Sequence, residues 1–456
     1  MNTVLKQTLQ NNNTGLFSNK ALRQLIIPLV IEQVLVILVG VADTMMVSYA
    51  GEAAMSGVSL IDMYAFMIIT IMAAVSTGGA IIVSQYLGNK DNRNANLSAS
   101  QLITVTVLVS TGLMAISMIL HREILNLFFG SVEPDVMQAA DRYLLITAIS
   151  FPFLGIYDSG AALYRSMEKT NITMYVSLLM NVINIVGNAI GIFVLKSGVA
   201  GVAIPTLVSR IAAGIIMTML VFRKSNTVYI SIREIFSWKS DYIKRILSIA
   251  IPNGIENGLF ALGRILVLSI TALFGTTQLA ANSAALSISQ IAILVVNAVN
   301  LAMVTVVGQC VGAEDYSQAS MYIKKLMKIS YIATFILSAG VCILLPFILS
   351  LYKLSFEAYH LSFILVFIHN IAAVILHPLS FNLPNGLRAA GDAKYTMYVG
   401  ICSMIIFRLG VALLFGIVMQ LGVIGVFIAM VADWTARSVL FVIRYISGKW
   451  KNYRAI

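Results

Sequence analysis

A long apolar stretch near the start of the chain, residues 27–51, limits what this sequence can fold into. It reads IPLVIEQVLVILVGVADTMMVSYAG, and about 20 apolar residues are enough for a helix to cross a bilayer. The stretch also contains two acids, Glu32 and Asp43. A charge at the centre of a spanning helix costs at least about 2.5–3.5 kcal/mol. These acids are therefore candidates for a functional role.

The same stretch recurs in the second half of the chain, at residues 251–275. Seven positions of the first copy are identical in the second when the two are aligned without gaps: Ile27, Pro28, Ile31, Glu32, Leu35, Leu38 and Gly51 return as Ile251, Pro252, Ile255, Glu256, Leu259, Leu262 and Gly275. Asp43 does not recur, because Val267 occupies the equivalent position. The chain is thus a tandem duplication in which one half holds an acid that the other lacks.

Composition identifies the class of protein. Hydrophobic residues make up 59% of the 456 residues and charged residues 11%, whereas a soluble domain carries about 25% charge. Backbone groups in lipid must be paired internally, and strong period-two alternation is absent, so we expect helices and not a barrel. The sequence predicts an all-α integral membrane protein with twelve transmembrane helices, at about residues 22–49, 57–86, 96–120, 136–163, 171–195, 199–222, 244–274, 278–310, 322–349, 357–386, 395–419 and 423–446.

The duplication predicts two pseudo-symmetric bundles of six helices. Further repeats support it: SQYLGNKD at 84–91 matches GQCVGAED at 308–315, and Arg165 matches Arg388. Six is an even number, so both halves insert in the same orientation, with a substrate cavity expected between them near the midplane. The predicted parts are a polar tail, an N-terminal lobe, a linker, a C-terminal lobe and a basic tail, at residues 1–20, 21–222, 223–243, 244–446 and 447–456.

The basic residues indicate how the chain is oriented. The net charge is +11, and 22 of the 30 Lys and Arg residues lie in the two tails and in the loops near residues 90, 167, 233, 325 and 391. Such a bias is the positive-inside pattern, so we expect both termini in the cytoplasm. Membrane topology explains these charges better than a nucleic-acid partner does.

Several of these motifs resemble the MATE family of multidrug and toxic compound extruders. The resemblance rests on the opening helix with Pro-x3-Glu and GVADTMMVSYAG, the SQYLGNKD loop and the AIPNGIENGLFALG start of the second half, and it extends from about residue 20 to 446. It implies a V-shaped pair of six-helix bundles and antiport, in which Na⁺ or H⁺ enters as amphipathic, often cationic, compounds leave. We accordingly expect a multi-pass, monomeric protein of the plasma membrane, in contact with lipids.

An ion-coupling site is expected around Asp43, which matches the coupling acid of the family. A carboxylate changes its charge when it binds H⁺ or Na⁺, as an antiporter requires. Asn184 and Asn188 are four residues apart and share a helix face. Asn184 and Thr206 match residues of the family's ion site, whereas Asn188 stands where many members carry a second aspartate. For Asp43 the alternative is a static ion pair with Arg210. For the asparagines the alternative is ordinary hydrogen bonding between helices.

Other intramembrane charges are candidates for the substrate cavity: Glu32, Glu256, Arg264 and Asp158. Glu32 lies eleven residues before Asp43, about three helical turns, so the two point to a similar face. A structural role is the alternative for the duplicated acids Glu32 and Glu256, because they can pair with an arginine such as Arg264 or stabilise a kink. Pro28 and Pro252 each remove a backbone donor and are candidates for helix bending, unless they lie in the first turn.

The remaining functional classes find little support. The sequence has no GxxxxGK[ST] motif, no Cys/His cluster and no nucleophile–base motif. We therefore expect no direct use of ATP, no enzymatic activity, no cofactor apart from the coupling ion, and no metal beyond possible Na⁺ at Asp43. A lipid-linked oligosaccharide flippase of a related fold is the alternative function, because four arginines lie within spans. A receptor or structural role offers no reason for the duplication.

Overall fold

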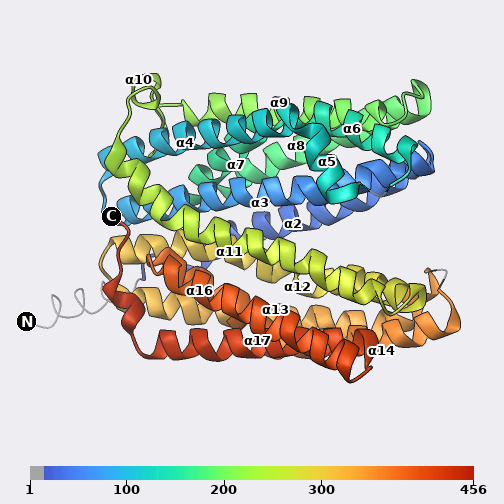
Figure 1. The fold of residues 1–456 in the computed structure, drawn as a ribbon. Coiled ribbons are helices and arrows are strands. Elements are labelled where there is room, and N and C mark those ends of the chain that lie inside the picture. The colour runs from blue at the N-terminus through green and yellow to red at the C-terminus, as the bar shows by residue number, and fades with distance from the viewer. Residues whose placement is uncertain (1–14, 131, 353) are drawn as a thin grey trace, which may run out of the picture. The chain divides into compact units, whose positions relative to one another are not determined.

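The computed structural model describes residues 15–130, 132–352 and 354–456, and within this part of the chain every regular element is a helix (Figure 1). Most of the predicted polar tail, residues 1–14, lies outside the described residues. The helices of the first half are α2 (Asn19–Ser48), α3 (Glu52–Gly88), α4 (Asn92–Ile119), α5 (His121–Phe129), α6 (Pro134–Ala148), α7 (Phe151–Ser166), α8 (Thr170–Ala189) with the π-helical turn η1 (Ile190–Val194), and α9 (Ala200–Val221).

The linker carries one short helix, α10 (Ile232–Ile235), before the second half begins. The helices of that half are α11 (Ser240–Ala272), α12 (Thr276–Gly312), α13 (Tyr316–Ser350), α14 (Phe356–His377), η2 (Pro378–Asn382), α15 (Leu383–Ala389), α16 (Ala393–Ser403), η3 (Met404–Gly410), η4 (Ala412–Val418), α17 (Gly422–Ile446) and the 3₁₀ turn η5 (Lys449–Asn452).

Eleven spans in the described residues are long and apolar enough to cross a membrane, and the count becomes 12 if α6 and α7 form one span. These two helices meet at an angle of 51°. Pro152, near the start of α7, cannot donate a backbone hydrogen bond to the preceding turn, which explains why the helix breaks there. The prediction of an all-α membrane protein with twelve spans in two lobes is confirmed.

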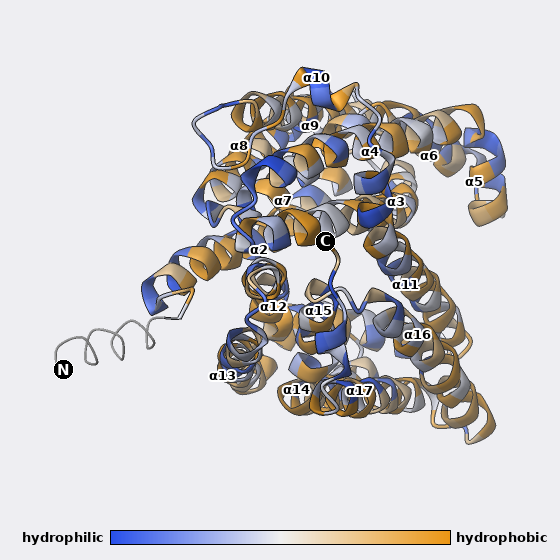
Figure 2. Ribbon diagram, turned by 90° about the vertical axis from the view of Figure 1, so that its left-hand side faces the viewer, coloured by the Kyte–Doolittle hydropathy of each residue, from blue (hydrophilic) through white to orange (hydrophobic). Residues whose placement is uncertain are grey.

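The long helices expose many large apolar side chains, and Figure 2 shows the apolar colour along most of their length. Val36, Leu38, Ile343 and Phe347 are each more than half exposed, at 57%, 59%, 77% and 66%. A soluble protein rarely exposes apolar patches of this extent. Lipid is the solvent that suits such surfaces.

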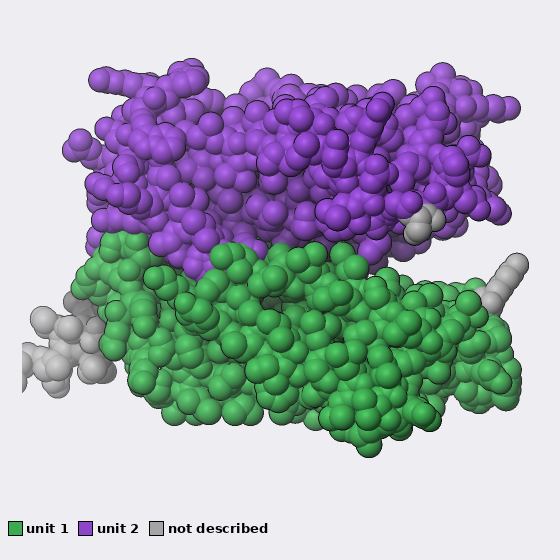
Figure 3. All heavy atoms as spheres, viewed as in Figure 1, with its two compact units in different colours: residues 1–22, 255–456 green, residues 23–254 purple. Residues whose placement is uncertain are grey.

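The described chain divides into two compact units (Figure 3). One unit comprises residues 23–254, and the other comprises residues 255–456 together with the start of the chain up to residue 22. The division differs from the predicted boundaries, because the linker and the start of α11 group with the first half. Contacts within that unit explain this: Gln101 on α4 donates to the backbone oxygens of Glu234 and Ser237, at 2.6 and 2.7 Å.

The duplicated sequence produces duplicated local structure. Gly51 and Gly275 precede α3 and α12 with φ angles of 103° and 94°, a conformation that favours glycine. Asp91 caps α4 by accepting from the backbone nitrogen of Asn94 at 3.1 Å, and Asp315 caps α13 through Gln318 at 2.9 Å. The identical residues of the two repeats thus perform the same structural task in each half.

Both duplicated prolines lie well inside their helices, α2 and α11, and not in a first turn. Each therefore removes a hydrogen bond from the middle of a spanning helix. The helices continue on either side of Pro28 and Pro252, so the predicted bending at these residues remains a prediction.

The duplicated acids form equivalent ion pairs. Glu32 lies 3.5 Å from Arg165, and Glu256 lies 2.7 Å from Arg388. The two arginines are themselves repeat partners, so one pair has been copied into both halves. Glu32 and Glu256 are buried, each 7% exposed, and an arginine beside each provides its countercharge. This is the pairing expected of charges inside a membrane protein.

We predict that Arg388→Met destabilises the protein far more than Arg454→Met. Removing one partner of a buried ion pair leaves an uncompensated charge, which costs about 3–5 kcal/mol. Arg454 also pairs with an acid, Glu314, but that acid is exposed, and surface pairs contribute about 0–1 kcal/mol. Thermal unfolding of the two variants in detergent measures the difference. Equal shifts in the unfolding temperature would contradict this interpretation of the pair.

Candidate functional site

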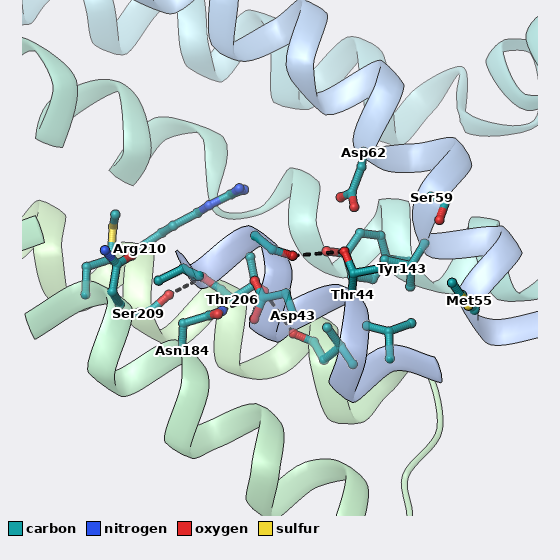
Figure 4. Close-up of a pocket in the computed structure, with 17 residues that line it drawn as sticks. Asp43, Thr44, Met55, Ser59, Asp62, Tyr143, Asn184, Thr206, Ser209 and Arg210 are labelled. Carbon is teal, nitrogen blue, oxygen red and sulfur yellow. Dashed lines mark hydrogen bonds between the residues drawn. The ribbon is translucent and has the colours of Figure 1, made fainter. Parts of the chain in front are cut away.

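A cavity of about 240 Å³ lies within the unit formed by residues 23–254 (Figure 4). Helices α2, α3, α6, α8 and α9 all contribute to its wall. The residues that line it are Val39, Gly40, Asp43, Thr44, Val47, Met55, Val58, Ser59, Asp62, Tyr143, Met180, Asn181, Asn184, Val202, Thr206, Ser209 and Arg210. A polar, charged cavity is unusual in spans of this hydrophobicity and marks a candidate site.

The Asp43 carboxylate meets an amide of α8. The Asn188 nitrogen donates to Asp43 Oδ1 at 2.8 Å, and Asn188 is fully buried. Hydrogen bonds to a charged acceptor are stronger than neutral ones, so this contact holds the carboxylate against α8. The sequence predicted that Asn188 shares a site with Asp43, and the structure brings the two side chains together.

Asn184 joins Asp43 to Thr206. One terminal atom of its amide lies 3.0 Å from Thr206 Oγ1, and the other lies 3.0 and 3.2 Å from the two carboxylate oxygens of Asp43. With its nitrogen toward the carboxylate, the amide donates to Asp43 and accepts from the Thr206 hydroxyl. Three helices, α2, α8 and α9, therefore place the four residues of the predicted ion site in one hydrogen-bonded cluster.

Arg210 lines the same cavity from α9 without forming an ion pair within the described part of the chain. Its Nη1 donates to the Ser150 hydroxyl at 2.9 Å, at the break between α6 and α7. A static Asp43–Arg210 ion pair, the alternative considered from the sequence, is therefore not formed in this structure. The guanidinium remains near the carboxylates of the cavity while a neutral hydroxyl holds it.

Sequence reasoning missed Asp62 and Tyr143, which line the cavity from α3 and α6. For Asp62, a comparison of the two repeats would have indicated the residue. When the halves are aligned so that Asp43 pairs with Val267, Asp62 pairs with Leu286. Asp62 is therefore a second acid that only the first half carries. Tyr143 offered no comparable signal, because a tyrosine in a membrane span is common.

The equivalent place in the second half is apolar. Val267, the counterpart of Asp43, belongs to a buried cluster with Ala412, Val426 and Ala429. When the halves are aligned so that Arg165 pairs with Arg388, Asn188 pairs with Val411. Val411 packs against the same cluster. The polar contact of one half is therefore an aliphatic contact in the other.

The other predicted cavity residues lie outside this cavity. Glu32 and Glu256 form the duplicated ion pairs described above. Asp158 lies on α7, partly buried, and Arg264 lies on α11, where its side chain is exposed. Asp433 and Arg437, four residues apart on α17, form an ion pair at 3.2 Å. A role toward a substrate remains a prediction for the four candidates Glu32, Glu256, Arg264 and Asp158.

Comparison with known proteins fits this duplicated, charged architecture. The family model MatE matches residues 28–190 and 252–432, which are one segment in each half. The chain belongs to the MatE family. This MATE transporter is similar to YisQ of Bacillus subtilis, described as an uncharacterised transporter, with 27% identity over 93% of both chains. It is also 25% identical to NorM of Thermotoga maritima, a probable multidrug resistance protein, over 95% of this chain and 93% of that protein.

Solved structures support the fold independently. An outward-facing multidrug resistance transporter of the MATE family aligns with a TM-score of 0.88 and 21% identity, over 95% of this chain and 96% of that chain. A MOP superfamily transporter from Pyrococcus furiosus aligns with a TM-score of 0.87 and 20% identity, over 94% and 96%. At this level of identity the likeness establishes a common fold, and the chemistry of the cavity must be argued from the residues of this chain.

We predict that Asn188→Leu lowers the stability of the transporter by about 1.5–3 kcal/mol, because it removes a hydrogen bond to a charged group. Asn181→Leu is the matched control on the same helix. The Asn181 amide nitrogen is buried and has no hydrogen-bond partner in the described structure, so replacing it with an apolar group should be neutral or stabilising. Thermal unfolding in detergent tests the pair, and equal losses would show that the Asp43 contact is not special.

Proposed function

We propose that this MATE transporter is a secondary active multidrug efflux transporter, which exports amphipathic or cationic compounds in exchange for H⁺ or Na⁺ by alternating access. The observation that carries the proposal is the contact of Asp43 with Asn188 inside a membrane-embedded cavity. The second half has only aliphatic residues at the equivalent place. Ion coupling needs an intramembrane acid that can bind and release a cation, and Asp43 is such an acid.

Asp43 exchanges the coupling ion in this proposal. A carboxylate in a membrane interior is neutralised when it binds H⁺ or Na⁺, and it regains its charge when the ion leaves. Asn184, Asn188 and Thr206 surround it with amide and hydroxyl groups that hydrogen-bond the charged form or provide oxygen atoms to a cation. The same cluster can therefore stabilise the carboxylate before and after the exchange.

The charges on the cavity wall favour a cationic substrate over a lipid-linked oligosaccharide. Two carboxylates, Asp43 and Asp62, and one guanidinium, Arg210, line the cavity. A flippase that binds a diphosphate would need an excess of cations there. NorM is described as a probable multidrug resistance protein and the outward-facing relative as a multidrug resistance transporter, which supports the same choice of substrate class.

We predict that Asp43→Asn abolishes gradient-driven efflux while folding is largely retained, because the variant keeps the shape of the side chain but cannot change its charge. Val267→Asn, at the equivalent position of the second half, should be mild unless packing suffers. Glu256→Gln should also cost less transport than Asp43→Asn, because Glu256 is already paired with Arg388. Dye efflux from vesicles, with H⁺ and Na⁺ gradients imposed separately, compares the three variants at equal membrane abundance.

Near wild-type pumping by Asp43→Asn under an imposed gradient would contradict the proposal. Glu256 would then become the better candidate for the coupling acid. The two gradients also separate the ions, because only the ion that Asp43 exchanges should drive efflux in the unmodified protein.

We further propose that the transporter is a monomer in the plasma membrane, with both termini in the cytoplasm. The distribution of Lys and Arg among the loops supports this orientation. The loops before α4 and α16 would then be cytoplasmic. The connections before α9 and α17 would lie outside the cell.

We predict a labelling pattern that follows from this topology. In a background without the three native cysteines, Arg93→Cys and Lys394→Cys should react with a membrane-impermeant thiol reagent only from the cytoplasm. Ser197→Cys and Leu421→Cys should react from outside. All four side chains are exposed, so access to the reagent is decided by the side of the membrane. The reverse pattern would overturn the proposed orientation.

A further inference from the structure

Asp62 and Asp43 have different surroundings within the same cavity. Asp43 is half-buried and is held by the amides of α8. Asp62 lies on the α3 wall and is exposed to the cavity, and Figure 4 shows its carboxylate pointing from α3 toward Tyr143 and Thr44. Asp43 is thus fixed in a hydrogen-bonded cluster of amides, whereas Asp62 faces the cavity beside the Tyr143 hydroxyl.

The size of the cavity limits what Asp62 can meet. Pockets that enclose a whole drug-sized molecule measure about 300–1,000 Å³, and this cavity measures about 240 Å³. It therefore has room for the charged group of an amphipathic compound, but not for the complete compound. Apolar side chains, among them Met55, Val58 and Met180, line the same cavity and suit the methyl or methylene groups around such a charge.

Arg210 sets the balance of charge around this space. It lines the cavity, and Asp62, Asp158 and Asp43 are the acids that surround it. Because Ser150 holds the guanidinium, and no ion pair among the described residues commits it to a carboxylate, Asp62 remains available to another cation. A positive group that enters the cavity is attracted by Asp62 and opposed by Arg210.

We propose that Asp62 is the carboxylate that binds the positively charged group of the substrate, while Asp43 exchanges the coupling ion. The inference rests on the proposed function and assigns separate tasks to the two acids of one cavity. Arg210 limits the affinity of Asp62 for the substrate, so that the cation can leave once it has been carried across. The charged substrate group is an ammonium or a similar organic cation with apolar substituents.

The test compares two probes on the full-length protein in proteoliposomes under an imposed gradient. The probes are fluorescent amphiphiles of the same size, one with a trimethylammonium group and the other with a neutral tert-butyl group. We expect Asp62→Asn to raise the KM of the ammonium probe about tenfold, because a charge-assisted contact is lost, and to leave the KM of the neutral probe within about twofold. Asp62→Glu should restore most of the affinity for the ammonium probe.

Three further variants make the test specific. Asp135→Asn removes an exposed carboxylate from the first turn of α6, outside the cavity, and should leave both KM values unchanged. Arg210→Gln should lower the KM of the ammonium probe about threefold, because the opposing charge is gone, whereas Arg210→Lys should not.

The outcomes separate the two proposals. If the unmodified protein exports the ammonium probe but Asp62→Asn changes neither KM, or changes both equally, the role of Asp62 is wrong and the efflux function stands. If the unmodified protein exports neither probe under either gradient, the proposed function itself fails, and the inference fails with it.

Discussion

A charge inside a bilayer must be compensated, and the arrangement of this transporter follows from how each intramembrane charge meets that requirement. Glu32 and Glu256 meet it with an arginine of the same unit, and the solution is the same in both halves. Asp43 meets it with amide donors, which stabilise a carboxylate without neutralising it. The first kind of compensation is permanent, whereas the second leaves the acid able to accept a cation. The difference distinguishes structural acids from an acid that can take part in a transport cycle.

Much of this could be predicted from the sequence, because the informative signals were periodic or repeated. The apolar runs predicted the spans, and the recurrence of the opening stretch at residues 251–275 predicted two halves with Asp43 in only one of them. Asn184, Asn188 and Thr206 were grouped with Asp43 through helical spacing and a family resemblance, and the structure places them in contact. What remained hidden depended on contacts between distant helices. Nothing in the spacing of Glu256 and Arg388 shows that they pair, and the approach of Ser150 to Arg210 depends on the bend between α6 and α7.

The two halves are asymmetric at a second acidic position, Asp62. Asp62 and Leu286 form the same kind of asymmetric pair as Asp43 and Val267, and the cavity contains both acids. The second half folds without an acid at the position equivalent to Asp62, so the fold as such does not require one there. Comparing the halves residue by residue is therefore a more sensitive guide to this site than the hydrophobicity of either half.

Where the two halves differ, both residues of a contacting pair differ. Where Asp43 meets Asn188, the second half packs Val267 and Val411 in one aliphatic cluster. Where Arg210 meets Ser150, the second half has Trp434 and Ala373, which belong to one apolar core. A lone polar residue in an apolar core would lack a partner, and burying an unpaired polar group or charge is costly. In the first half, each of these two polar contacts joins two polar partners, which offsets the cost of burying them. At the positions equivalent to Asp43, Asn188, Arg210 and Ser150, the second half has apolar residues on both sides of the contact, so neither partner is left buried alone.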